Sequence, residues 1–417
     1  MQSVNGDIAI RLTRFPTATP LLRLGLYLAM LIPCIAHAET AALEFPTDVD
    51  ELVAALESQL EVGEFEDAAQ QIESWLATQD RDGYDLSLAE PFMLLGDARM
   101  GMRDPVGAIE AYDRARHITR LSKGIQGIEQ LPILYREADA FSALGDDATA
   151  NDRQEFAFGI SRREYGADDP RHMIGTYRLL HWYRHHYKYL AAHVLFEQLL
   201  EISREHLPAG DPLHLRMLRE HAQLFRHRVF GRRTIGRGRF LATPPGLLPH
   251  RYRQNVSSFR EGRNALAEVV EIQESNALAS DGELATALLE YADWHLMFGD
   301  YPFAVRHYRR IWDLLASDPE RRTRLFGQPT PLFLPLPSDP GYRLRRVGMH
   351  RDGIVHLALT VTHRGHVIGS KSLEVAPRSI MEFRVRKAAK RARFRPAFRE
   401  GQPVKVRGHP LRYTYSY

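Results

Sequence analysis

The feature that most constrains the fold is a helical pattern that repeats between residues 50 and 327, with glycine-containing turns between the helical runs. Apolar residues recur at three- and four-residue spacing, which is typical of helices that bury one face. Small residues and Gly-Asp turns return at similar offsets, with a period in the thirties to forties of residues. This self-similarity predicts an array of stacked helical hairpins rather than one compact core. The recurring positions are Leu95-Gly96, Ala108, Tyr112 and Ala115; Ala138, Gly145-Asp146, Ala150 and Ala157; and Tyr291-Ala292, Gly299-Asp300-Tyr301, Ala304 and Tyr308.

This pattern resembles the tetratricopeptide repeat. Small residues let the two helices of a hairpin approach each other, and glycine ends the first helix in a left-handed conformation. Two further helix starters, Gly166-Ala-Asp-Asp-Pro170 and Gly210-Asp-Pro212, lie about 42 residues apart, which resembles the longer repeats of kinesin-light-chain-like proteins. The resemblance implies a groove that binds a protein or peptide, and hence a non-enzymatic function.

The charge of the chain is divided unevenly. From Arg343 to Tyr417 there are 18 Lys or Arg residues and four acidic residues, a net charge of +14, whereas the whole chain carries +3. An acidic body of net charge −11 therefore precedes a basic C-terminal region. Two kinds of partner fit this region: an anionic glycan or lipid, or the acidic neighbour within the same chain.

The C-terminal region changes from a helical to a strand pattern. Val355, Leu357, Leu359 and Val361 alternate with other residues, and a turn and a second strand follow to Val375. Pro377 opens a predicted helix of about 15 residues with Ile380, Phe383 and Ala388 on one face, and residues 404–417 form a last strand. The predicted fold is therefore mainly α: a helical-hairpin array followed by a small ββαβ domain at residues 341–417.

The order of motifs in this domain resembles the C-terminal domain of TonB and TolA-like envelope proteins. In that family the last strand pairs with an extended peptide of an outer-membrane receptor, by strand addition at an open sheet edge. The resemblance departs at Ala392, where the family often has tryptophan. The motif residues are Gly353, Gly365, Arg393, Phe394 and Pro396, and the implied docking edge contains Val404, Val406, Leu411, Tyr413 and Tyr415.

A proline-rich linker is predicted at residues 328–340, between the array and the C-terminal domain. Its five prolines favour extended backbone, so it spans at most about 45 Å. True TonB proteins have a much longer spacer that crosses the periplasm. The short linker therefore favours an adaptor over an ordinary energy transducer.

The N-terminus has the pattern of an export signal at residues 1–38. An apolar run from Leu24 to Ile35 follows basic residues, and Ala36-His37-Ala38 supplies a cleavage site before Glu39. Export predicts a periplasmic protein and argues against a nucleic-acid partner. Two alternatives stay open: a lipid attached at Cys34, the single cysteine, or an uncleaved anchor from Pro16 to Ile35. An anchor would suit the alternative function, a TonB-type energy transducer for outer-membrane transport.

Histidines and basic residues are the remaining candidates for a metal site or an anion-binding surface. His181 and His185 lie one helical turn apart beside His186, but they lack a His-Glu-x-x-His pattern and stand among aromatic residues. We therefore predict no metal there, and in the absence of nucleophile or phosphate-binding motifs we predict no catalytic residue and no cofactor. A basic loop at residues 226–250, with six arginines up to Phe240, is a candidate surface for anionic glycan or lipid. A second candidate is a row along one helix face: Arg384, Lys387, Arg391 and Arg395.

Overall fold

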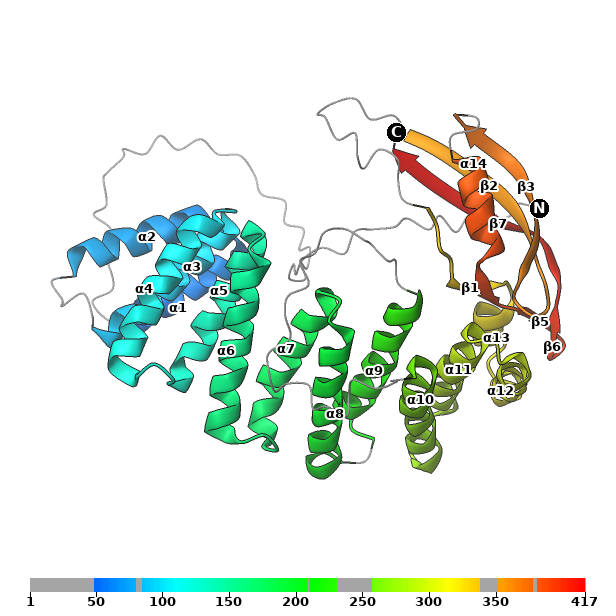
Figure 1. Ribbon diagram of the computed structural model, residues 1–417, viewed down its shortest axis with the longest axis horizontal. Helices are drawn as coiled ribbons and strands as arrows, with labels where there is room; N and C mark the ends of the chain where they lie inside the picture. Colours follow the sequence, from blue (N-terminus) through cyan, green and yellow to red (C-terminus); the bar gives the residue numbers. More distant parts are fainter. Residues whose placement is uncertain are drawn as a thin grey trace, which may run out of the picture.

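The computed structural model describes residues 49–79, 85–208, 210–230, 257–337, 352–377 and 381–416. The export signal at residues 1–38 and most of the predicted basic loop, residues 231–250, lie outside the described residues. Within them, helices stack into an arch, and a small β-sheet with one covering helix stands at its C-terminal end (Figure 1). The predicted class, a tetratricopeptide-like array followed by a small sheet domain, is confirmed.

Consecutive helices of the array pack against each other as hairpins. The first helix of each pair carries an odd number and the second an even number, and α13 follows the last pair. The helices are α1 (Val49–Val62), α2 (Phe65–Thr78), α3 (Ala89–Gly101), α4 (Pro105–Lys123), α5 (Leu131–Leu144), α6 (Asp147–Tyr165), α7 (Met173–His185), α8 (Tyr189–His206), α9 (Pro212–Phe230), α10 (Ser258–Ser275), α11 (Asp281–Met297), α12 (Tyr301–Leu314) and α13 (Pro319–Phe326).

The middle of the array has a regular period of 42 residues. Short 3-10 helices begin at Leu86, Ile128 and Pro170, 42 residues apart in each case, and α3, α5 and α7 follow them directly. Gly124 and Gly166 end α4 and α6 with φ of +86° and +92°, a conformation that glycine adopts without strain. The long period that the sequence indicated is therefore a real structural repeat.

Gly-Asp turns start the second helices, as the sequence predicted. Asp146 and Asp300 accept hydrogen bonds from the backbone N–H groups of Thr149 and Phe303, which are otherwise unpaired at a helix N-terminus. Small residues also act as predicted: a Cβ added to Gly96 would lie 2.2 Å from the Tyr112 ring. The helices of this hairpin can therefore approach closely only because residue 96 is glycine.

The C-terminal domain is a three-stranded antiparallel sheet in the order β3-β2-β7, packed against α14. Alternate residues of β2, including Val355 and Leu357, face Val385 and Ala389 of the helix in one apolar core. The ββαβ order is confirmed, and four short strands accompany it. The elements are β1 (Thr330–Phe333), β2 (Asp352–Val361), β3 (Val367–Ala376), α14 (Glu382–Lys390), β4 (Arg393–Arg395), β5 (Ala397–Arg399), β6 (Gln402–Val404) and β7 (Val406–Ser416).

Several predicted boundaries need correction. The helix α14 has nine residues rather than about 15, and Phe383 is 75% exposed because Val385, Ala388 and Ala389 form the buried face. Ile380 lies outside the described residues. The predicted loop at 226–250 begins too early, since α9 continues to Phe230.

The segment predicted as a linker contains a strand. Residues 330–333 form β1, which pairs antiparallel with β4 of the C-terminal domain. Pro331 is compatible with this pairing because β1 is an edge strand, where a missing N–H group is tolerated. The two parts of the chain are therefore joined by backbone pairing rather than by an extended tether alone. In the described part of the chain, the helices are too short or too polar to cross a membrane.

Candidate interaction site

Polar contacts join the first helices of successive hairpins into one row, from α3 through α5, α7 and α9 to α11. Each contact links a side chain of one first helix to a side chain of the next, so the contacts fix the orientation of neighbouring hairpins. We call this row the first-helix ladder. Its members are Asp97–Arg136 (2.8 Å), Asp139–Arg178 (3.5 Å), Tyr177–Glu220 (2.7 Å) and Arg219–Glu290 (2.7 Å).

Glu220 on α9 is the most connected carboxylate of the ladder. It accepts hydrogen bonds from the Tyr177 hydroxyl (2.7 Å) and the Arg216 guanidinium (3.0 Å), and Nε2 of His181 lies 3.4 Å away. Burial alone would raise the pKa of Glu220, but hydrogen bonds from His181, Tyr177 and Arg216 outweigh it and lower the pKa to about 2. The carboxylate therefore stays ionised well below neutral pH.

Replacing Glu220 by glutamine is expected to reduce stability at pH 7 by about 1–3 kcal/mol, because the hydrogen bonds to a charged acceptor are weakened. The pKa of Glu220 is lowered by folding, so its contribution is complete above the ordinary carboxyl pKa of 4.5 and disappears as the pH falls toward about 2. Thermal unfolding of both proteins across this range should show the difference between them shrinking in acid. A difference that does not change with pH would contradict this role.

Beyond the last pair of the first-helix ladder, α11 carries another carboxylate, Asp293. Its partner comes from the C-terminal domain. The guanidinium of Arg395 in β4 forms a two-pronged ion pair with Asp293, with Nη2–Oδ2 at 2.6 Å and Nε–Oδ1 at 3.0 Å. The Tyr308 hydroxyl donates to the same carboxylate at 2.7 Å, and Arg395 also donates to the carbonyl of Leu325. Arg395 is 7% exposed, so this contact is removed from water.

Charge pairing and burial determine the protonation states of Arg395 and Tyr308. Burial would lower the pKa of Arg395, but the Asp293 carboxylate outweighs it and raises the pKa, so the guanidinium remains charged. Burial, reinforced by Asp293, raises the pKa of Tyr308, so the phenol remains protonated and acts as a donor. A buried ion pair of this geometry leaves a costly unpaired charge if one partner is lost.

The same arrangement occurs earlier in the array. Asp97 accepts from the Tyr112 hydroxyl, 15 residues later, and pairs with Arg136 of the next hairpin. Asp293 accepts from Tyr308, also 15 residues later, and pairs with Arg395. The C-terminal domain therefore supplies the arginine that a following hairpin supplies inside the array.

Aromatic packing reinforces this junction. Phe398 of β5 is 1% exposed and belongs to the apolar core of the array. Its ring centroid lies 4.9 Å from Phe326, 5.9 Å from Tyr308 and 6.2 Å from Trp312. The C-terminal domain thus covers the apolar end of the last hairpin as well as neutralising Asp293.

Among the motif residues predicted from the TonB resemblance, Gly365 and Phe394 contact each other. A Cβ on Gly365 would lie 1.9 Å from the carbonyl oxygen of Phe394, and the Phe394 N–H donates to the carbonyl of Gly365 at 2.9 Å. A Cβ on Gly353 would lie 2.3 Å from the Tyr415 ring. Arg393 pairs with Phe333 of β1, and Pro396 joins β4 to β5. Close packing thus explains the two glycines of the motif, Gly353 against β7 and Gly365 against β4.

The predicted docking edge falls on two strands. Val404 lies in β6 and pairs with Ala397, so the expectation of one strand from residue 404 is wrong: Lys405 separates Val404 from β7. Val406 begins β7 opposite Val361. The side chains of Leu411, Tyr413 and Tyr415 are buried in the domain core.

The described basic and histidine candidates lie in different surroundings. Arg384, Lys387 and Arg391 are exposed at α14 and its end, but Arg395 lies in β4 and is buried, because it pairs with Asp293. Arg226, in the predicted basic loop, lies on α9 and donates to the carbonyl of Leu332. His181, His185 and His186 do not converge: Nδ1 of His185 and His186 face the carbonyls of His181 and Trp182, one turn back on their own helix.

Asp293, Tyr308 and Phe398 were not singled out as functional by the sequence. A signal for Asp293 was present, because it follows Tyr291-Ala292 as Asp97 follows Leu95-Gly96 in the aligned repeat. Arg395, the partner of Asp293, lies 102 residues later in the chain, so only the folded chain shows this contact.

No family model and no curated protein matches the chain. Three solved structures align with part of the chain. A kinesin light chain candidate with nearly identical TPR-like repeats, from Podosopora anserina, is 16% identical over 57% of this chain and 98% of its own, with a TM-score of 0.41. BtubC (BKLC) from P. vanneervenii is 13% identical over 65% and 92%, with a TM-score of 0.38. The apo form of RapI is 12% identical over 66% and 79%, also with a TM-score of 0.38.

Proposed function

We propose that this chain is a non-enzymatic adaptor of the bacterial periplasm. The helical array binds a protein or peptide, and the C-terminal sheet docks to a second envelope component by strand addition. The observation that carries the proposal is the junction at Arg395 and Asp293, which fixes the sheet to the end of the array. The junction would hold the binding surface of the array and that of the sheet at a fixed distance from each other, as an adaptor requires.

One edge of the sheet is suited to strand addition. Among the described strands, β7 is the last of the sheet and pairs with β2. Gly408, with φ of +80°, and Pro410, which lacks an N–H group, interrupt the first half of β7. The second half, from Leu411 to Ser416, offers the more regular backbone. Since alternate side chains there are buried, a partner strand would bind through backbone groups and through the exposed residues Arg412 and Thr414.

Within the first-helix ladder, Asp139 and Arg178 offer the most accessible charges. Their side chains are 63% and 41% exposed, and their 3.5 Å separation makes a weak pair in water. A bound peptide can therefore exchange this pair for its own charges at little cost. The more buried contacts of the first-helix ladder would keep the hairpins aligned while the peptide is bound.

The junction favours an adaptor over an energy transducer. A transducer needs its C-terminal domain to reach across the periplasm, whereas Arg395 and Phe398 hold this domain against the array. N-terminal sequencing of the chain from bacterial membranes and periplasm separates the two functions. A start near Glu39 in the periplasm is expected, and an intact N-terminus in the inner membrane would contradict export of a cleaved protein.

Site-specific photo-crosslinking in living bacteria tests the docking edge. A photoreactive amino acid at Thr414 is expected to form a defined adduct with an envelope protein, because Thr414 is exposed on β7, the strand proposed to receive the partner. The same amino acid at Ile368, which is 58% exposed on the opposite edge strand β3, serves as the matched control. Equal adducts at both positions, or none at Thr414, would refute docking through β7.

A further inference from the structure

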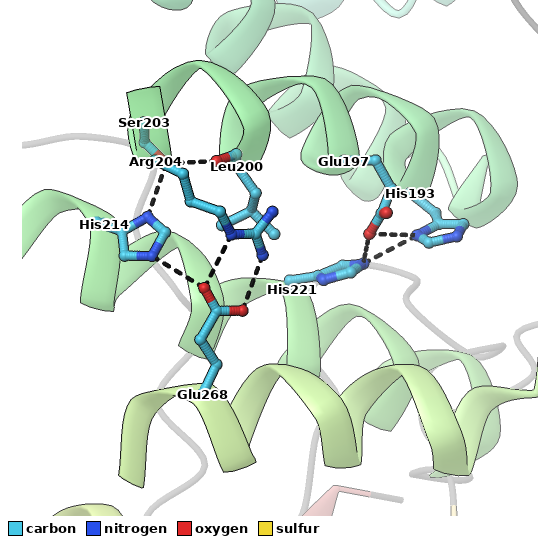
Figure 2. Close-up of polar contacts among 8 residues, drawn as sticks. All are labelled: His193, Glu197, Leu200, Ser203, Arg204, His214, His221 and Glu268. Carbon is cyan, nitrogen blue, oxygen red and sulfur yellow. Dashed lines mark hydrogen bonds and ion pairs between the residues drawn. The ribbon is translucent and has the colours of Figure 1, made fainter. Parts of the chain in front are cut away.

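Two helices in the middle of the array bring two histidines and a glutamate together. His193 and Glu197 lie one turn apart on α8, and His221 lies opposite them on α9 (Figure 2). Nδ1 of His193 is 2.9 Å from Nε2 of His221, and Oε1 of Glu197 is 3.9 Å and 3.6 Å from these nitrogens. Within the described residues, this is the group of three such side chains whose ligand atoms all lie within 4.8 Å of one another.

The spacing of these atoms matches a metal ion. In the plane of the three atoms, the point equidistant from them lies about 2.0 Å from each, which is the length of zinc bonds to histidine nitrogen and carboxylate oxygen. Two histidines and one glutamate are also a donor set that zinc accepts when a fourth position is left for water or another ligand. A hydrogen bond between the imidazoles accounts for the 2.9 Å contact, but it gives no role to the carboxylate beside them.

The site is enclosed on one side and open on the other. His193 and His221 are 4% and 3% exposed, and His221 packs against the rings of Phe196 and Phe225. The Glu197 side chain is 40% exposed, so an ion can enter from that side. A metal bound here would link α8 to α9 in the centre of the arch.

We propose that His193, Glu197 and His221 form a binding site for a divalent transition-metal ion, with zinc as the ion that best fits the donor set. The site is independent of the adaptor function proposed above, since it lies away from β7 and from the Arg395 junction. The packed helices α8 and α9 hold the three donors in place, two on one turn of α8 and one on α9.

The same region provides a matched control. Glu268 on α10 is also a partly exposed glutamate beside a buried histidine, His214, at 3.3 Å (Figure 2). It differs in that Arg204 already occupies its carboxylate with two hydrogen bonds, at 2.9 Å and 2.8 Å. Since Glu268 has one histidine and a competing guanidinium, Glu268→Gln should leave metal binding unchanged.

Calorimetric titration of the purified full chain with zinc chloride, after treatment with a chelator and without a histidine tag, tests the proposal. One equivalent of zinc is expected to bind and to raise the midpoint of thermal unfolding. Glu197→Gln should weaken binding by at least about tenfold, a loss seen even for residues that only orient metal ligands. Glu197 is partly exposed, so this variant should fold, and circular dichroism checks that it does.

The results that would overturn the proposal are equally defined. Absence of saturable zinc binding, unchanged binding by Glu197→Gln, or an equal loss in Glu268→Gln would each exclude the site. The double variant His181→Gln/His185→Gln should bind zinc as the wild type does, and loss of binding in it would move the metal to α7. None of these outcomes bears on crosslinking through β7.

Discussion

Replacing Arg395 by methionine is expected to reduce the free energy of unfolding by about 3–5 kcal/mol, the cost of removing one partner from a buried ion pair. The Asp293 carboxylate would keep only the Tyr308 hydroxyl as a donor, with its side chain 17% exposed. Methionine preserves the apolar length of arginine, so the loss reflects the charge rather than a cavity. Chemical denaturation of the full chain, followed by circular dichroism, measures the effect.

Two further variants separate the ion pair from general damage. The double variant Arg395→Met/Asp293→Asn removes both charges and keeps an oxygen for the Tyr308 hydroxyl, so it should recover most of the lost stability. Arg136→Met breaks the equivalent pair inside the array, where the arginine side chain is 35% exposed, and should cost only about 1 kcal/mol. Equal losses for Arg395→Met and Arg136→Met would contradict the special role of the junction.

Replacing Gly365 by alanine is expected to destabilise the C-terminal domain by about 2–5 kcal/mol. Its φ of +77° costs a residue with a Cβ about 1–2 kcal/mol. The added Cβ would also lie 1.9 Å from the carbonyl oxygen of Phe394, so β4 must move, at a cost of about 1–3 kcal/mol. Because β4 carries Arg395, the displacement should also loosen the junction.

Gly369 on β3 is the matched control for Gly365. The nearest atom to a Cβ at Gly369 is the Thr360 hydroxyl oxygen at 3.9 Å, which is ordinary contact. Gly369→Ala should therefore change stability by less than about 1 kcal/mol, as substitutions in strands do. The comparison is read from denaturation midpoints of the two variants, and similar losses in both would exclude a specific contact between the turn and β4.

Local signals account for the parts of the fold that the sequence predicted. Glycines with positive φ, followed by aspartates that cap the second helix, mark hairpin turns at residues 145–146 and 299–300. Alternation in β2 marks a strand with one buried face. These features depend on neighbours within one turn or one strand, so a single sequence contains them.

The candidate site depended on contacts between distant residues. Arg395 lies four residues after Arg391, a spacing that suggests an exposed row on one helix face. In the structure Arg395 belongs to strand β4, and it is buried where it pairs with a carboxylate 102 residues earlier in the chain. Prolines at 331 and 335 suggested a tether, but β1 pairs along an edge where a missing N–H group is tolerated. His193 and Glu197 have a common helical spacing that does not by itself indicate a site. The site is recognised only when α9 places His221 beside them.

The junction also decides whether the array can fold without the C-terminal domain. An array joined to a separate domain by a linker alone would stay folded after deletion of residues 353–417. In the structure this deletion removes both Arg395 and Phe398. The deletion is therefore expected to destabilise α11, α12 and α13, since the last hairpin would lose a buried charge partner and part of its apolar cover.

Hydrogen exchange of the full chain tests most directly whether the C-terminal domain stands in for the next hairpin. Peptides from α11, α12 and the segment β4–β5 are compared between the wild type and Arg395→Met, with α3 and α4 as an internal reference. Faster exchange should appear together in α11, α12 and β4–β5 and leave α3 and α4 unchanged. Unchanged protection of α11 and α12 in the variant would show that the array does not depend on the domain, and would contradict the account.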